Sequence, residues 1–334
     1  MGLLGNLFHP ERFQGRGRKR PYFEGWYYKL VDASTRHRYA VIPGIYRGPS
    51  QEDDHCFVQF MDGLSGQVTY YRYAADAFSA SSDALDVQVG PSRFLRDGML
   101  LELDAPDQRV RGEVRFEDVK PWPVTLRSPG IMGWYAYVPL MQCYHGVVSL
   151  DHRLVGALRV DSTLVDLTGG RGYTEKDWGT TFPAAWIWFQ SNHLGQEGSS
   201  VTASVAVIPW LWTSFPGFIM GILHEGKLHR FATYTGAHMD QLSVDQDSIV
   251  WVVSDGAYRL SLSIERTAAA QLYAPDIRDM SARVGETIQA RADVHLEALG
   301  QGMDGKAHSV LRGSTKVGAL EVVGDVRRLS PRAS

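Results

Sequence analysis

The chain has 334 residues, of which 44% are hydrophobic and 21% charged, and its formal net charge is -3. This length favours two domains, and the composition is that of a globular protein with a full core rather than of a disordered chain. The acidic balance excludes the composition of a nucleic-acid-binding protein, and Cys56 and Cys143 are too few and too far apart for a disulfide framework or a structural zinc site.

Residues 1–20 are predicted to form a flexible basic leader. It contains Arg16, Arg18, Lys19 and Arg20. This run could touch anionic lipid, but a solvated tail is favoured because firm attachment needs a longer cluster. No apolar stretch reaches the roughly 20 residues that cross a bilayer, and no signal-peptide core is present. We expect a cytoplasmic location, and peripheral membrane contact stays open.

Residues 21–168 are predicted to form a first β domain. Short runs rich in Val, Ile, Tyr, Phe and Trp alternate with turn residues, which is typical of strands. The predicted strands are Tyr22 to Val31, Tyr39 to Tyr46, His55 to Met61, Gln67 to Tyr73, Met99 to Leu103, Val110 to Phe116, Tyr144 to Leu150 and Leu154 to Val160. Asp151-His152-Arg153 is predicted to be the turn between the last two strands.

Residues 169–334 show the same pattern after Gly169-Gly170 and are predicted to form a second β domain. Its predicted strands are Trp186 to Asn192, Val201 to Ile208, Phe218 to Leu223, Leu228 to Thr233, Ile249 to Val253, Tyr258 to Ile264 and Val317 to Val323. Two series of short strands indicate an all-β protein with two antiparallel barrels or sandwiches.

Glu24 lies in the first predicted strand among large apolar side chains. Because strand side chains alternate, it shares one face with Trp26 and Tyr28. A carboxylate there must find a partner or take up a proton, so Glu24 is a candidate general acid, with Trp26 and Tyr28 as candidate ligand contacts. Alternatively, Glu24 pairs with an Arg or Lys inside the barrel, or with backbone N–H groups, and holds the fold.

The segment from residue 172 to residue 183 is predicted to be a polar loop at the mouth of a cavity, because charged and hydroxyl residues stand beside Trp and Gly. Its candidate acids are Glu175 and Asp177, and its candidate ligand contacts are Lys176 and Trp178. In the alternative, the charged residues form a solvated turn.

The strand that follows carries an aromatic wall and two neutral hydrogen-bonding groups on one face. These are Trp186, Trp188, Gln190 and Asn192. They suit a ligand with an apolar body and one polar end, and we expect them to meet the polar loop in one pocket. In the alternative, the Trp pair is part of the core.

His145 is a further candidate, because it stands in a strongly aromatic segment with Tyr135 and Tyr137. Its ordinary pKa, about 6.5, allows it to move a proton to or from a ligand hydroxyl. Tyr135 and Tyr137 are candidate ligand contacts, and a hydrogen-bonded core histidine is the alternative interpretation.

Several common chemistries lack their motifs. The chain has no nucleophile elbow, phosphate-binding P-loop, H-E-x-x-H or dinucleotide fingerprint. His224 and His229 flank a predicted hairpin turn without a third ligand. We therefore expect no metal and no cofactor.

In these segments the sequence resembles the tocopherol cyclase family. The matching parts, in order, are Tyr22 to Lys29, Gly172 to Gly179 with Phe182-Pro183, Trp186 to Gln190, and Gly313 to Gly324. They span nearly the whole chain, and the string Y-x-E-K-x-W-G is long enough to be specific. The chain departs from the plant pattern at Asp177, where Asn is expected, at Ala184-Ala185, which replace basic residues, and in lacking a plastid transit peptide.

The resemblance implies two lipocalin-like antiparallel β-barrels packed together, and an isomerase that closes a chroman-type ring on a prenylated quinol without a cofactor. Ring closure needs a proton for an alkene, which Glu24, Glu175 or Asp177 could supply, and aromatic faces that shelter a tertiary cation. The partner is then a hydrophobic small molecule and not a nucleic acid. A carrier of isoprenoid ligands and a polyene hydratase remain the alternatives.

Overall fold

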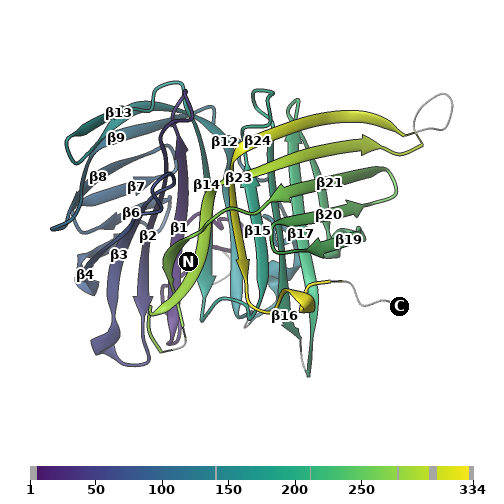
Figure 1. Ribbon diagram of the computed structural model, residues 1–334. Coiled ribbons are helices and arrows are strands. Elements are labelled where there is room, and N and C mark those ends of the chain that lie inside the picture. The colour runs from purple at the N-terminus through teal and green to yellow at the C-terminus, as the bar shows by residue number, and fades with distance from the viewer. Residues whose placement is uncertain (1–5, 140, 211, 277, 301–306, 331–334) are drawn as a thin grey trace. The chain divides into compact units, whose positions relative to one another are not determined.

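The computed structural model describes residues 6–139, 141–210, 212–276, 278–300 and 307–330, which form two large antiparallel sheets (Figure 1). The prediction of an all-β protein is confirmed, since the elements are strands and short 3-10 helices. The 3-10 helices are η1 (Gln51–Asp53), η2 (Ala75–Ala77), η3 (Gly133–Tyr137), η4 (Thr233–Thr235) and η5 (Val326–Arg328). No helix in the described part of the chain is long and apolar enough to cross a bilayer.

The chain divides into two compact units. The first runs to Phe182 and also contains Ala270–Val284, and the second comprises Pro183–Ala269 and continues from Gly285. This division differs from the predicted boundary between residues 168 and 169. Gly169 and Gly170 form a turn inside the first unit, because the strands on both sides of them belong to the same sheet.

The first unit is built on one twelve-stranded sheet with the order β4-β3-β2-β1-β14-β12-β9-β8-β7-β6-β5, with β13 beside β12. Its strands are β1 (Tyr22–Val31), β2 (Arg38–Arg47), β3 (His55–Asp62), β4 (Val68–Ala74), β5 (Phe78–Ala80), β6 (Asp86–Val89), β7 (Ser92–Leu95), β8 (Gly98–Asp104), β9 (Arg109–Glu117), β12 (Cys143–Val160), β13 (Thr163–Asp166) and β14 (Arg171–Gly179). A small sheet joins β10 (Val124–Thr125) to β11 (Ser128–Pro129). Strand β22 (Ala270–Ala274) packs on β3 and β4.

The first sheet curls, so that side chains from distant strands meet. The strands β3 and β6 contact each other although many strands separate them in the sheet order. The ring of Tyr28 on β1 lies 5.9 Å from those of Phe94 on β7 and Phe116 on β9. Aromatic burial of this kind stabilises the curled shape beyond its area alone.

The second unit has a large sheet with the order β18-β17-β16-β15-β24-β23-β21-β20-β19. Its strands are β15 (Trp186–Ser191), β16 (Ser200–Trp210), β17 (Thr213–His224), β18 (Lys227–Ala232), β19 (His238–Val244), β20 (Ser248–Ser254), β21 (Tyr258–Glu265), β23 (Ala282–Ala298) and β24 (His308–Val323). Ile187 and Phe189 of β15 belong to its buried apolar core. Alternation therefore places Trp186, Trp188 and Gln190 on the other face of β15.

The predicted turn at Asp151-His152-Arg153 is wrong, because the chain continues through it as the single long strand β12. The carboxylate of Asp151 is bound by Arg171 of β14, and the hydroxyl of Ser149 donates to the carbonyl of Asp151. Register shifts before His152 accommodate these polar groups. Partners on β14 thus satisfy residues whose types are typical of a turn.

His152 is fully buried, with Nδ1 2.8 Å from the hydroxyl oxygen of Ser149. The neighbouring Gly172 allows this close approach, because a Cβ there would lie 2.2 Å from Nε2 of His152. Burial lowers the pKa of His152 to about 3. The ring is therefore neutral at ordinary pH.

We expect His152 to make the folded state sensitive to acid. Below a pH of about 6.5 the unfolded chain binds a proton at His152, whereas the folded state does not bind it until the pH reaches about 3. The free energy of unfolding therefore decreases as the pH falls through this window, and the decrease is about 2 kcal/mol at about pH 5. His152→Asn keeps a donor towards Ser149 and should remove this loss in urea titrations at neutral and acid pH. The exposed His238→Asn is the control, and an unchanged acid loss in His152→Asn would contradict the argument.

Candidate functional site

Three neighbouring strands of the first unit, β1, β14 and β12, carry most of the predicted site residues. The predicted polar loop is wrong, because residues 171–179 form the central strand β14. Its charged side chains alternate between two faces, and each face supplies their partners. We call the side with Glu24, Trp26, Tyr144, Lys176 and Trp178 the ion-pair face, and the side with Cys143, His145, Tyr173, Glu175 and Asp177 the histidine face.

A fully buried ion pair lies at the centre of the ion-pair face. Lys176 Nζ is 2.6 Å from Glu24 Oε1, and both side chains are 0% exposed. The ammonium also lies 5.0 Å from the ring of Trp26 and 4.6 Å from that of Trp178. Burial lowers the pKa of Lys176, while the adjacent Glu24 opposes that shift.

The carboxylate of Glu24 has further donors on the same face. The backbone N–H of Gln14 donates to both of its oxygens, at 2.9 and 3.0 Å, and the hydroxyl of Tyr22 donates to Oε2. Burial, followed by the charge of Glu24, raises the pKa of Tyr22 well above its usual value. This geometry favours the alternative in which Glu24 pairs with a lysine and backbone N–H groups and holds the fold.

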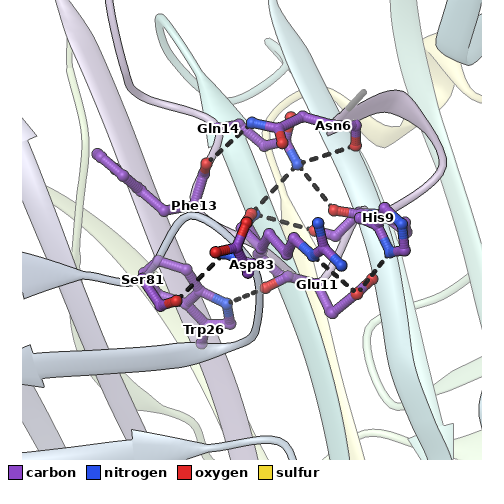
Figure 2. A network of polar contacts seen from close by, with 11 residues as sticks. Asn6, His9, Glu11, Phe13, Gln14, Trp26, Ser81 and Asp83 are labelled. Atoms are coloured by element: carbon purple, nitrogen blue, oxygen red, sulfur yellow. Dashed lines mark hydrogen bonds and ion pairs between the residues drawn. The ribbon is translucent and has the colours of Figure 1, made fainter. Parts of the chain in front are cut away.

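Residues of the predicted leader close the ion-pair face. Lys176 donates to the carbonyls of Pro10, at 2.9 Å, and Arg12, and the indole N–H of Trp26 donates to that of Glu11 at 3.0 Å. Figure 2 shows the side-chain amide of Gln14 reaching back to the leader's own carbonyls. These are the carbonyls of Asn6, His9 and Arg12.

The leader prediction therefore differs from the structure. Phe13 and Gln14 are buried, and two of the four basic residues bind the first unit: Arg16 donates to the carbonyl of Ala80, and Arg20 pairs with Asp54. Backbone carbonyls and a buried amide, rather than charge alone, hold the segment in place. Residues 1–5 of the predicted leader lie outside the described residues.

The histidine face brings three of the four predicted catalytic residues together. His145 Nδ1 lies 2.9 Å from Asp177 Oδ1, and its Nε2 lies 3.6 Å from Glu175 Oε2. The hydroxyl of Tyr173 donates to Glu175 at 2.5 Å. A positive charge on the ring would stand between two carboxylates, which attract it strongly in a partly buried site. This arrangement can hold a proton and release it to a bound molecule.

Two side chains differ in how accessible they are on this face. The side chain of Asp177 is 27% exposed and that of Glu175 is 7% exposed. Cys143 Sγ lies 4.0 Å from Asp177, and burial, with a smaller effect of Asp177, raises the pKa of this thiol well above its usual value. A neutral thiol is a poor nucleophile, so the proton chemistry of the face rests on His145 and its carboxylates.

The same three side chains are also the place where a metal ion could bind. One ligand atom each from His145, Glu175 and Asp177 lies within 4.8 Å of the others. Imidazole with two carboxylates suits a divalent cation such as Zn²⁺. The sequence predicted no metal site, and a chelator control can test that prediction here.

A cavity of about 190 Å³ lies beside Trp178 and Tyr144 in the first unit. The two rings stack with centroids 5.6 Å apart and an interplanar angle of 9°. The cavity is lined by Asn6, Leu7, Pro10, Gln14, Arg18, Pro129, Met132, Ala136, Tyr137, Val138, Pro139, Tyr144, His145 and Trp178. Sequence reasoning found His145, Tyr137 and Trp178 but missed the leader and the residues in and around η3, whose apolar residues show no strand period.

The other predicted ligand contacts of the first unit lie away from this lining. Tyr28 packs inside the curled sheet, and Trp26 binds the leader. Tyr135 packs against Trp134 with ring centroids 4.2 Å apart and an interplanar angle of 31°. Lys176 belongs to the ion pair.

The second unit holds the remaining predicted contacts. The indole N–H of Trp186 donates to Glu321 at 2.6 Å, and Trp188 and Asn192 are buried. Gln190 is 0% exposed, and within the described residues neither its Nε2 nor its Oε1 has a hydrogen-bond partner. Because β14 and β15 belong to different units, the single pocket expected from both strands stays a prediction.

We expect the buried ion pair to dominate the stability of the first unit. Lys176→Met leaves the Glu24 carboxylate buried without its counter-ion, which should lower the free energy of unfolding by about 3 to 5 kcal/mol in urea titrations. Arg93→Met is the control, because it breaks an exposed pair with Asp86 worth less than about 1 kcal/mol. Equal effects of the two substitutions would contradict the structural role.

Comparison with known proteins identifies the family of this chain. A family model described as "Tocopherol cyclase-like" matches residues 88–324. The "Probable tocopherol cyclase, chloroplastic" of Oryza sativa subsp. japonica is 23% identical over 271 residues, which is 66% of this chain but only 58% of the rice protein. The "Tocopherol cyclase, chloroplastic" of Zea mays is 22% identical, covering 92% of this chain and 76% of that protein. The chain thus spans little more than half of the rice relative's length.

A solved structure supports the fold. The crystal structure of CghA with Sch210972 superimposes with a TM-score of 0.56 at 10% identity. The match covers 91% of this chain and 88% of that one. At this identity the likeness concerns the fold alone.

Proposed function

The chain belongs to the tocopherol cyclase-like family, and from this premise we propose that it is an intramolecular cyclase, an isomerase that closes a chroman-type ring on a prenylated quinol. The observation that supports this most directly is His145 between Asp177 and Glu175, at 2.9 and 3.6 Å. Ring closure by protonation of an alkene needs such a proton donor and no cofactor.

The proposed reaction begins with a proton moving from the charged imidazole of His145 to the less substituted carbon of the alkene. The alkene electron pair forms the new C–H bond and leaves a tertiary cation. The quinol hydroxyl oxygen attacks that carbon, and its proton returns to the imidazole. No atom is gained or lost, so substrate and product have the same mass.

The two carboxylates hold the ring and balance its charge during this cycle. Asp177 fixes Nδ1, and Glu175, itself held by Tyr173, faces Nε2. Positioning the hydroxyl against the alkene supplies much of the rest, since a pre-oriented intramolecular attack is worth on the order of 7 to 11 kcal/mol.

Aromatic residues would bind the apolar part of the substrate and shelter the cation. We assign this role to Trp178 and Tyr137 at the cavity of the first unit. Gln190 and Asn192 would bind the polar end. We further propose that each curled sheet is a lipocalin-like barrel, which the contact between β3 and β6 supports in the first unit, and that the protein works in the cytoplasm.

Loss of the proton donor should affect turnover more than binding. With a prenylated hydroquinone as substrate, His145→Gln should lower kcat by roughly 100 to 10,000-fold and Asp177→Asn by less, with KM little changed. Chroman product of unchanged mass is measured by chromatography and mass spectrometry. Cys143→Ser is the matched control, because its neutral thiol lies on the same face.

The same assay separates the alternatives. Binding without conversion across several prenyl lengths would reject catalysis and indicate a carrier, and a product heavier by one water would indicate a hydratase. Conversion lost with a chelator and restored by Zn²⁺ would assign His145, Glu175 and Asp177 to a metal site. Full activity in His145→Gln would contradict the proposed donor.

The orphaned amide of Gln190 predicts an unusual pair of effects. Among the residues that the structure describes, the other buried side chains with an unbonded polar atom, such as Thr69 and Trp251, have one such atom each, whereas Gln190 has two. An unsatisfied buried polar group costs about 1 to 3 kcal/mol, so Gln190→Leu should leave the melting temperature of the free protein unchanged or raise it. Affinity for the prenylated quinol should fall about tenfold or more in calorimetry, because a hydroxyl loses its partner.

Gln59→Leu is the matched control. The Gln59 amide donates to the carbonyl of Tyr273 at 2.9 Å and accepts from its N–H at 2.7 Å. This substitution should lower the melting temperature and leave the affinity unchanged. If Gln190→Leu destabilises the protein as much and binds the quinol normally, Gln190 is a structural residue.

A further inference from the structure

The hairpin of β16 and β17 ends in a fully exposed tryptophan. Trp210 pairs with Thr213 across the end of the hairpin, and the side chain of Trp212, in the turn between them, is 101% exposed. In Figure 1 the end of this hairpin extends beyond β15 at the lower edge of the second unit. An indole in this position contributes nothing to a core.

The exposed tryptophan belongs to an apolar hairpin end. Pro209 is exposed, and Trp210 and Phe215 are half-buried, with their rings 6.4 Å apart. Nearer the base of the same strands, Val205 and Phe218 are buried. The change from buried to exposed apolar side chains therefore occurs along one continuous hairpin.

The hairpin carries no Asp, Glu, Lys or Arg, and its one histidine, His224, lies at the end of β17 far from the turn. Residues 198–223 contain no Asp, Glu, Lys, Arg or His. Leu164 is also exposed, but it stands singly on β13, which is ordinary for a protein surface. An uncharged hairpin end with two tryptophans and a phenylalanine is suited to an environment that is apolar on one side and wet on the other.

We propose that the end of the β16–β17 hairpin inserts into the interfacial region of a lipid bilayer, with Trp212 as its main anchor. Tryptophan concentrates at the headgroup level, where its ring contacts the acyl chains and its N–H meets polar groups. A protein partner would need charged or several polar groups to fix its register, and the side chains of the hairpin end offer only the hydroxyls of Thr213 and Ser214 and the indole N–H groups.

This attachment is apolar rather than electrostatic. The basic residues of the leader are partly engaged within the first unit, Arg16 with the carbonyl of Ala80 and Arg20 with Asp54. Binding should therefore occur on uncharged lipid and persist in high salt, unlike attachment through a basic cluster. The inference does not depend on the proposed cyclase activity, since it concerns a surface rather than the reaction.

The experiment is co-sedimentation of the full chain with phosphatidylcholine vesicles, with and without phosphatidylserine, at low and high salt. Wild-type protein should bind both vesicles at both salt concentrations, and Trp212→Ser should reduce partitioning about tenfold. Leu164→Ser, which removes an exposed leucine of the first unit, is the matched control and should bind as wild type does. The melting temperature of Trp212→Ser should be unchanged, because the side chain makes no buried contact.

Brominated phosphatidylcholine gives a second measurement. It should quench part of the tryptophan fluorescence of the wild type, and that part should be missing in Trp212→Ser. Absence of vesicle binding by the wild type, or equal binding by Trp212→Ser, would overturn the proposal. So would binding that requires phosphatidylserine and disappears in high salt, or a dimer in lipid-free solution that Trp212→Ser abolishes. Turnover of a short-chain quinol should be the same in both proteins. If the protein proves not to be a cyclase, the vesicle measurements still test the membrane proposal.

Discussion

The ammonium group of Lys176 has no exposed surface, so neighbouring groups must replace all of its hydration. Removing an ion from water costs several kcal/mol, and only a close counter-ion with further hydrogen bonds offsets that cost. Glu24 supplies the charge, and the carbonyls of Pro10 and Arg12 accept the remaining protons. One side chain thus fixes the register of β14 against β1 and holds the leader on the sheet.

The ion pair also determines where proton chemistry can occur. On the ion-pair face every polar atom of Glu24 is engaged inside the protein, and a proton could reach it only if the leader moved away. Alternation along β14 places Asp177 on the opposite face, where its side chain keeps 27% of its surface. The leader covers the ion pair, which stabilises the fold, whereas Asp177 stays partly exposed beside His145 on the opposite face. The same strand therefore carries both the buried lysine and the carboxylate next to the proposed proton donor.

The sequence predicts elements well where apolar side chains define them. The bounds of β1 are as predicted, and the next predicted strands up to β9 are right within one residue at either end, because each is a run of apolar residues between turn residues. The strand predictions fail at β14 and at the centre of β12, where charged residues are of the types that are typical of turns. Their partners, such as Glu24 for Lys176 and Arg171 for Asp151, are distant in sequence. The candidate acids on β14 thus stand on a strand and not in the predicted loop, and the sequence RGYTEKDWG shows no apolar alternation that would have indicated a strand.

Pairs of residues of the same type show which side chains the fold uses and which side chains have no role in folding. The amide of Gln59 is bound at both ends and that of Gln190 at neither within the described chain. The indole of Trp26 is buried and donates to Glu11, whereas that of Trp212 is in water. Folding alone would select against an orphaned buried amide, since replacing it with an apolar group costs nothing and relieves its desolvation. Such leftover groups are therefore where selection for a ligand or a surface is most directly visible, and they lie outside the network that Lys176 organises.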